Sequence, residues 1–187
     1  MTLDLTKAGE EAAIEEVKQM MVKLNWGTAA DFDLAALVEY KDMKQPPELV
    51  FFNNQGDLNI APFIKLSKDQ GVGDTVADGG KNEETLRIMK MDENIAKIHL
   101  IAWDWGSVKN SAESRFADSD VVITAINQDA TPIPVSLEGG SGNTSVVTCI
   151  DNTSPMGAKV VNVSKCGLLK EVTGDNLIPQ LLSIING

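Results

Sequence analysis

The chain has 187 residues, of which 43% are apolar, and a formal net charge of -11 at pH 7. This composition excludes a disordered or fibrous protein, and no apolar run approaches the about 18 residues that a membrane-spanning helix needs. The negative charge and the lack of Lys/Arg clusters argue against nucleic acid as a partner.

The length fits one domain, and no internal repeat, linker or step in charge marks a second, so we expect a single domain over residues 1–187. Residues 1–16 lack the basic start and the apolar stretch of a secretory signal. We therefore expect a cytoplasmic protein. In those reducing surroundings, Cys149 and Cys166 are expected to be buried thiols rather than a disulfide.

Short segments with alternating apolar residues dominate the first half of the chain. The pattern predicts an edge strand at residues 3–6, helical composition at residues 10–16 and a strand in the second half of residues 17–26. Residues 31–40 are typical of a strand with Asp31, Asp33 and Ala35 on one face and Phe32, Leu34 and Ala36 toward the core. A short strand at residues 49–52 ends at a turn formed by residues 53–57.

Residues 71–84 combine glycines with oxygen-bearing side chains and show no apolar periodicity, so the sequence predicts a loop and excludes a strand. Carboxylates and amides on a flexible backbone suit Ca²⁺, which takes about six to eight oxygen ligands. An acidic loop in so acidic a chain is more often merely solvated, and convergence of the carboxylates would distinguish the two. The side chains concerned are Asp74, Asp78, Asn82, Glu83 and Glu84.

The second half of the chain alternates short apolar segments with Gly, Asn and Pro turns. Strands are predicted at residues 85–91, 95–105, 120–126, 133–137, 145–150 and 159–163, the last two paired, with a glycine-rich turn at residues 138–143. Residues 95–105 are apolar on both faces, as in the middle of a core. Leu177, Leu181 and Ile184 repeat at helical spacing and predict a short C-terminal helix. An all-β sandwich or barrel follows.

Several of these segments together resemble the TerD family of bacterial stress and tellurium-resistance proteins, over residues 3 to about 137. The motifs are Trp26, Asp31-Phe32-Asp33-Leu34, Val50-Phe51-Phe52-Asn53-Asn54, Gly73-Asp74-Thr75 and Asn82-Glu83-Glu84, in this order. The resemblance implies a cytoplasmic two-sheet β-sandwich that binds calcium, has no established enzymatic activity and acts in toxic-oxyanion and phage stress. It also implies protein partners in a stress-response assembly, with peripheral membrane contact as a further possibility.

The resemblance implies a ligand set drawn from three separated regions of the chain. Ala35 and Gly27 stand where the family usually has acidic residues, so we expect one ion, or two with one of them weak. The implied metal ligands are Asp31, Asp33, Asn53, Asp74, Asp78, Asn82, Glu83 and Glu84.

The residues give little support to an enzyme. His99, the only histidine, lies in the middle of a predicted strand, where a packed residue is expected rather than a catalytic base. The tryptophans are expected in the core, and Asp104 is either an ordinary strand-end residue or a carboxylate near the ion-binding loops. The alternative function is a metal-assisted hydrolase acting on phosphoesters. Phosphoester turnover with calcium would favour the hydrolase, and calcium-dependent capture of partners would favour an interaction module.

Overall fold

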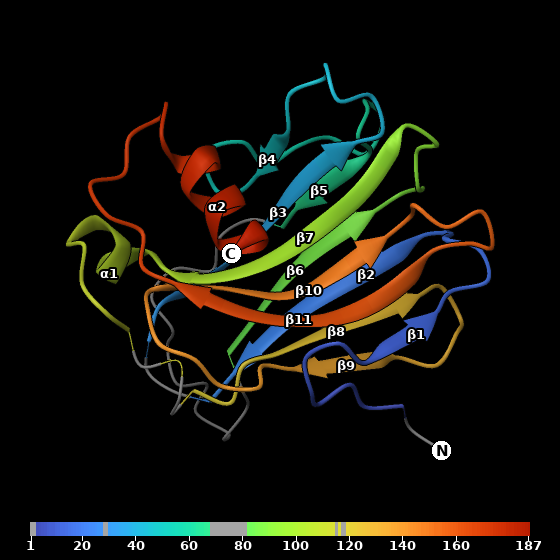
Figure 1. Cartoon of the computed structure of the whole chain (residues 1–187). Helices are drawn as coiled ribbons and strands as arrows, with labels where there is room; N and C mark the ends of the chain where they lie inside the picture. The colour runs from blue at the N-terminus through green and yellow to red at the C-terminus, as the bar shows by residue number, and fades with distance from the viewer. Residues whose placement is uncertain (1–2, 28–29, 68–81, 115, 117–118) are drawn as a thin grey trace.

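The computed structural model describes residues 3–27, 30–67, 82–114, 116 and 119–187. Within these residues the strands form two antiparallel sheets (Figure 1). The six-stranded sheet has the order β1 (Glu11–Ala13), β11 (Lys159–Gly167), β10 (Thr144–Asp151), β7 (Ile95–Asp104), β3 (Phe32–Tyr40) and β4 (Glu48–Val50). The five-stranded sheet has the order β5 (Ile64–Leu66), β6 (Asn82–Ile88), β2 (Met20–Trp26), β8 (Val122–Asn127) and β9 (Ile133–Ser136).

The inner faces of the two sheets pack against each other and form the main core. Alternation directs the side chains: in β2 the residues from Met20 to Trp26 alternate between buried and half-buried. Leu24 and Leu86 of the five-stranded sheet and Leu34 and Leu100 of the six-stranded sheet belong to one cluster of fully buried residues. The predicted two-sheet β-sandwich is therefore confirmed.

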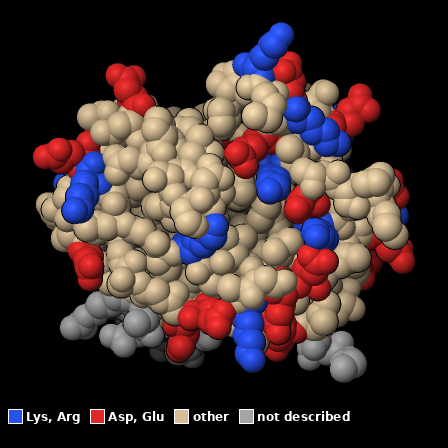
Figure 2. Space-filling view, in the orientation of Figure 1, with Lys and Arg blue, Asp and Glu red and all other residues tan. Residues whose placement is uncertain are grey.

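The six-stranded sheet is also buried on part of its outer face, beneath the C-terminal helix α2 (Leu177–Asn186). Leu177 and Leu181 of α2 share a second buried cluster with Ile101 and Trp103 of β7. The predicted C-terminal helix is thus confirmed, and β7 is buried on both faces, as its sequence indicated. Figure 2 shows that the surface over α2 is a broad area without charged side chains.

Three local predictions are wrong. Residues 10–16 are not helical, because Glu11–Ala13 form the edge strand β1. Residues 3–6 do not form a regular strand, since Leu5 makes only an isolated bridge to Val135. The predicted loop ends earlier than residue 84, because Asn82, Glu83 and Glu84 already belong to β6 and pair with β2.

Other local predictions are confirmed or extended. Cys149 and Cys166 are both free thiols, although Cys166 is only half-buried. Trp26 and Trp103 are buried as expected, whereas Trp105 is only half-buried. A short helix that the sequence did not indicate, α1 (Trp105–Lys109), follows β7 directly. No helix in the described part of the chain has both the length and the apolar character to span a bilayer.

The contact between α2 and the sheet predicts a large cost for truncating Leu181. Leu181 is fully buried, so Leu181→Ala should lower the free energy of unfolding by about 2–5 kcal/mol. Met156→Ala is the matched control, because Met156 is 95% exposed, and it should change stability by less than about 0.5 kcal/mol. Urea denaturation of the three proteins measures the difference, and equal stability would show that α2 adds little.

His99 is the packed strand residue that the sequence predicted. It is 3% exposed, and its Nε2 lies 2.6 Å from Oε2 of Glu39 on the neighbouring strand. Burial lowers the pKa of the His99 imidazole below its ordinary value, against the opposing effect of the Glu39 carboxylate. As the pH falls, the His99 imidazole is therefore protonated in the unfolded chain before it is protonated in the folded protein.

A lowered histidine pKa in the folded state predicts how stability depends on pH. The contribution of neutral His99 to the free energy of unfolding is fully present above the ordinary histidine pKa of about 6.5 and is lost as the pH falls below it. The free energy of unfolding should drop between about pH 7 and about pH 5 more steeply than in His99→Gln, which keeps a donor for Glu39 but does not titrate. Denaturant curves across this range test it, and parallel profiles for both proteins would contradict it.

Candidate metal centre

One edge of β3 is open at the end of the sandwich that carries α1. The pairing of β3 with β4 covers only Ala36 to Val38, because β4 ends at Val50. The chain then turns back on itself, with Phe51 and Asn54 exchanging backbone hydrogen bonds of 3.0 and 2.9 Å. Among the described residues, no other strand pairs with this edge of β3, so its first residues offer backbone groups to side chains from elsewhere.

Glu84 reaches this edge from the other sheet. It faces the inside of the sandwich, because it pairs with the buried Leu24 and precedes Leu86 by one full strand period. Its Oε2 accepts a hydrogen bond of 2.7 Å from the backbone N–H of Leu34. The Glu84 residue is only 7% exposed, so this carboxylate joins the two sheets within the protein interior.

Asp33 lies directly beside that contact, on the opposite face of β3. It pairs with Trp103 of β7, whose side chain belongs to the buried cluster between the six-stranded sheet and α2. The Asp33 residue is 7% exposed. Asp31 immediately precedes β3 and is half-buried. Since successive side chains alternate across a strand, Asp33 lies on the same face of β3 as Ala35, as the sequence predicted. Glu84 thus contacts the inner face of β3 at Leu34, and Asp33 carries an acidic side chain on the outer face.

The remaining predicted ligands divide into four groups. Glu83 points to the other face of β6, where it accepts from Asn25 Nδ2 at 3.2 Å and lies 3.8 Å from Lys23 Nζ. Asn53 is exposed in the turn that follows β4, beyond the open edge of β3. Asn82 begins β6 opposite Trp26, at the same end of the sandwich. Asp74 and Asp78 lie outside the described residues.

The described residues alone do not complete a metal-binding group. Among them, no three His, Cys, Asp or Glu side chains lie together in an arrangement that could hold an ion. Asp33 and Glu84 are the buried acidic residues of the described part of the chain; Asp33 lies near the start of β3 and Glu84 near the start of β6. Oxygen ligands of this kind suit a hard cation such as Ca²⁺. The predicted ligand set as a whole therefore stays a prediction.

Two further acidic residues lie at this end that the ligand prediction did not include. Asp120 precedes β8, and its Oδ2 would lie 3.8 Å from a Cβ atom on Gly27. Asp104 is the N-cap of α1, where it accepts from Ser107 N at 3.2 Å and from Ser114 Oγ at 2.7 Å. Asp104 is therefore a structural strand-end residue, and the spacing of Asp104 and Ser107 was the available signal for its cap.

Comparison with known proteins does not assign the chain to a family. No protein-family model matches the chain, and a search of curated proteins finds no match. The TerD resemblance therefore rests on the motifs quoted above.

The contact between Glu84 and Leu34 predicts a specific ordering of two variants. Glu84→Ala leaves a buried N–H without this acceptor and should lower the free energy of unfolding by about 1–3 kcal/mol. Glu84→Gln keeps the shape and one acceptor oxygen, so it should cost clearly less. Urea denaturation in the presence of a chelator measures this without any contribution from metal.

The control for this pair of variants is Glu83→Ala. The Glu83 side chain is 42% exposed, and surface ion pairs contribute only about 0–1 kcal/mol. If Glu84→Gln were as unstable as Glu84→Ala, the Leu34 contact would not be what stabilises this edge.

Proposed function

We propose that the chain is a calcium-binding, non-enzymatic protein whose ion lies at the open edge of β3, between the starts of β3 and β6. The observation that carries the proposal is the burial of two acidic residues at the starts of β3 and β6. Glu84 accepts from the N–H of Leu34, and Asp33 precedes Leu34 on the opposite face of β3, both only 7% exposed. Asp31 precedes the same strand, and further oxygen-bearing residues follow β4 and precede β8.

The chemistry of these residues supports calcium over other metals. Carboxylate and amide oxygens in irregular positions suit Ca²⁺, whereas Mg²⁺ prefers a strict octahedron and keeps several waters. Zn²⁺ and copper favour imidazole and thiolate. His99 lies farther along β7, paired with Leu37 rather than with the residues at the open edge.

The bound ion would order a surface for protein partners. The turn beyond the open edge carries Phe51 and Phe52, whose rings are 5.1 Å apart and only half-buried. The ring of Phe52 lies 4.9 Å from Trp105, which begins α1. An ion at the edge of β3 would stabilise the strand that precedes this aromatic group. Together with the TerD-like motifs, this favours a role in a stress response of the tellurium-resistance type.

Calcium should therefore stabilise the folded chain. An ion that binds only the folded state adds RT ln(1 + [Ca²⁺]/Kd), or about 2.7 kcal/mol at a hundredfold excess over Kd. Calorimetric titration of calcium into chelator-treated protein should show binding, and the melting temperature should rise with calcium. Identical melting curves with calcium and with chelator would refute the proposal.

Variants locate the ion. Asp33→Asn and Glu84→Gln each remove a charge with little change in shape, and each should weaken calcium binding by about tenfold or more, or about 1.4 kcal/mol. Glu93→Gln is the matched control, because Glu93 is an exposed acid in the turn between β6 and β7, at the other end of the sandwich. If the control weakened binding as much as Asp33→Asn, calcium would be responding to net charge alone.

A further inference from the structure

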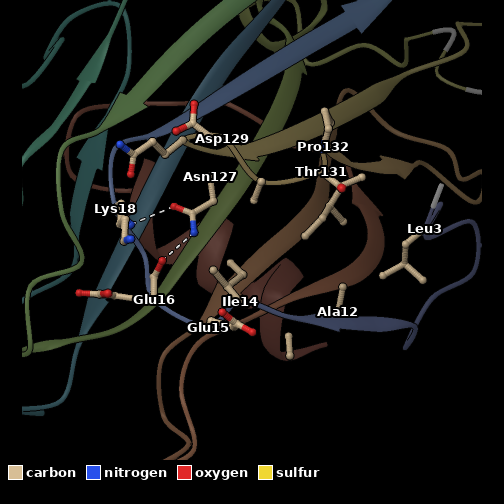
Figure 3. Close-up of a pocket in the computed structure, with 14 residues that line it drawn as sticks. Leu3, Ala12, Ile14, Glu15, Glu16, Lys18, Asn127, Asp129, Thr131 and Pro132 are labelled. Atoms are coloured by element: carbon tan, nitrogen blue, oxygen red, sulfur yellow. Dashed lines mark hydrogen bonds between the residues drawn. The ribbon is translucent and has the colours of Figure 1, made fainter. Parts of the chain in front are cut away.

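A groove of about 680 Å³ lies at the end of the sandwich away from the candidate metal centre. One wall is the end of β1 with the segment after it, and the other wall is the turn that joins β8 and β9. Figure 3 shows Ala12 on the first wall, Thr131 and Pro132 on the second, and Leu3 at the mouth. The volume is in the range of about 300–1,000 Å³ that ligand sites occupy.

The groove runs along an open strand edge. Strand β1 is the last strand of its sheet and pairs only with β11 among the described strands. Ala12 pairs with Val160, and the N–H of Ile14 donates to Ala158, so the even-numbered residues of β1 face β11. The backbone N–H and C=O groups of Glu11 and Ala13 therefore point the other way, toward the groove. Such an edge is a template for a further strand.

Among the described residues, from Leu3 onward, the amino-terminal segment does not extend into this space along β9. The N–H of Leu5 donates to Pro134 O at 3.0 Å, and the N–H of Ser136 donates to Leu5 O at 3.0 Å, which is parallel pairing. The next donor toward the groove would be the nitrogen of Pro134, which carries no hydrogen. The pairing of the amino-terminal segment with β9 therefore stops at Leu5, and the space between β1 and β9 stays open.

One end of the groove is fixed by Asn127. Its Oδ1 accepts from Lys18 N at 2.9 Å, and its Nδ2 donates to Glu16 O at 2.6 Å (Figure 3). These two bonds tie the segment after β1 to the end of β8, so the walls keep their separation without an occupant. A preformed site of this kind spends little free energy on ordering when it binds.

The apolar and charged residues around the groove indicate what kind of segment could bind there. Its floor is apolar and includes Ile14 and Ile133, whereas its rim carries the exposed acids Glu15, Glu16 and Asp129 against the single base Lys18. The chain as a whole carries a net charge of -11, which attracts cationic partners over a distance. A segment that alternates apolar and basic side chains would place one set on the floor and the other at the rim.

We propose that the outer edge of β1 accepts an extended segment of another protein, in which apolar residues alternate with Lys or Arg, as an additional strand. The backbone groups of Glu11 and Ala13 supply main-chain hydrogen bonds, and the acids of the rim select for basic side chains. A second copy of this chain is a poor occupant, because edge-to-edge pairing of β1 would bring Glu15 and Glu16 against the same acids, whereas Glu11 is already paired with Lys159 at 2.6 Å. The site lies beyond the start of β2, so it is independent of the proposed calcium site.

A synthetic peptide tests this proposal on the full chain. The probe is a short capped peptide in which valine alternates with lysine, and its control has glutamate in place of every lysine. The lysine peptide should bind, with the largest amide chemical-shift changes at Glu11 and Ala13, and binding should weaken with added salt. Calcium should leave the affinity unchanged. Equal binding of the glutamate peptide would overturn the proposal.

Two variants separate the strand edge from the charge. Ala13→Pro removes an outward N–H while leaving the bonds of Ala12 and Ile14 to β11, and it should abolish binding. The triple variant Glu15→Gln, Glu16→Gln and Asp129→Asn should weaken binding about tenfold. Its matched control, Asp42→Asn with Asp57→Asn and Glu93→Gln, neutralises three exposed acids elsewhere and should bind like the wild type.

The outcomes are decisive even if Ala13→Pro fails to fold, because the triple variant changes only exposed side chains. Wild-type affinity of the triple variant would overturn the proposal. So would concentration-dependent dimerisation with shift changes at Glu11 and Ala13 in the absence of peptide, since this would make a second copy the occupant.

Discussion

The burial of β7 on both faces is the constraint on which the arrangement of the molecule depends. Its inner face packs on the five-stranded sheet, and its outer face, at Ile101 and Trp103, packs beneath α2. Strand β7 pairs with β10 on one side and β3 on the other, so it is an inner strand, and β1 and β4 form the two edges of its sheet. Both edges are short strands of 3 residues, so each leaves a neighbouring region of backbone incompletely covered. The candidate metal centre lies where β4 ends, and the groove lies along the outer edge of β1.

The inter-sheet contact of Glu84 follows from the shortness of β4. Because β4 stops opposite Ala36, the N–H of Leu34 has no partner strand on that side among the described residues, and a buried amide without an acceptor is costly. Glu84 supplies the acceptor across the sandwich at 2.7 Å. The preceding residue, Asp33, is a second buried acid, on the opposite face of β3. Two buried acidic residues thus lie at this end of the sandwich, and a cation bound there would offset their charge.

The fold was largely readable from the sequence, whereas the site was only partly so. Period-two alternation located most strands, and the continuous apolar character of residues 95–105 correctly indicated burial on both faces. Polarity misled at Glu83 and Glu84, which looked like loop residues but form a strand paired with β2. The role of Glu84 was not predictable, because its partner Leu34 is 50 residues away and the contact depends on where β4 ends. The edge strand β1 was missed because its Glu and Ala residues favour helix and only pairing with β11 makes them a strand.

The two proposed sites lie at opposite ends of β2 and should not depend on each other. Strand β2 has 7 residues and spans about 20 Å at about 3.4 Å per residue, from Met20 beside the groove to Trp26 beside the start of β6. That separation exceeds the Debye length of about 8 Å at physiological ionic strength, so a calcium ion at one end is screened from charges at the other. Mechanical coupling would have to pass through the close-packed core between them. If both proposals hold, one acidic chain would present two separate surfaces for cationic partners, one built from side-chain oxygens and the other from a strand edge.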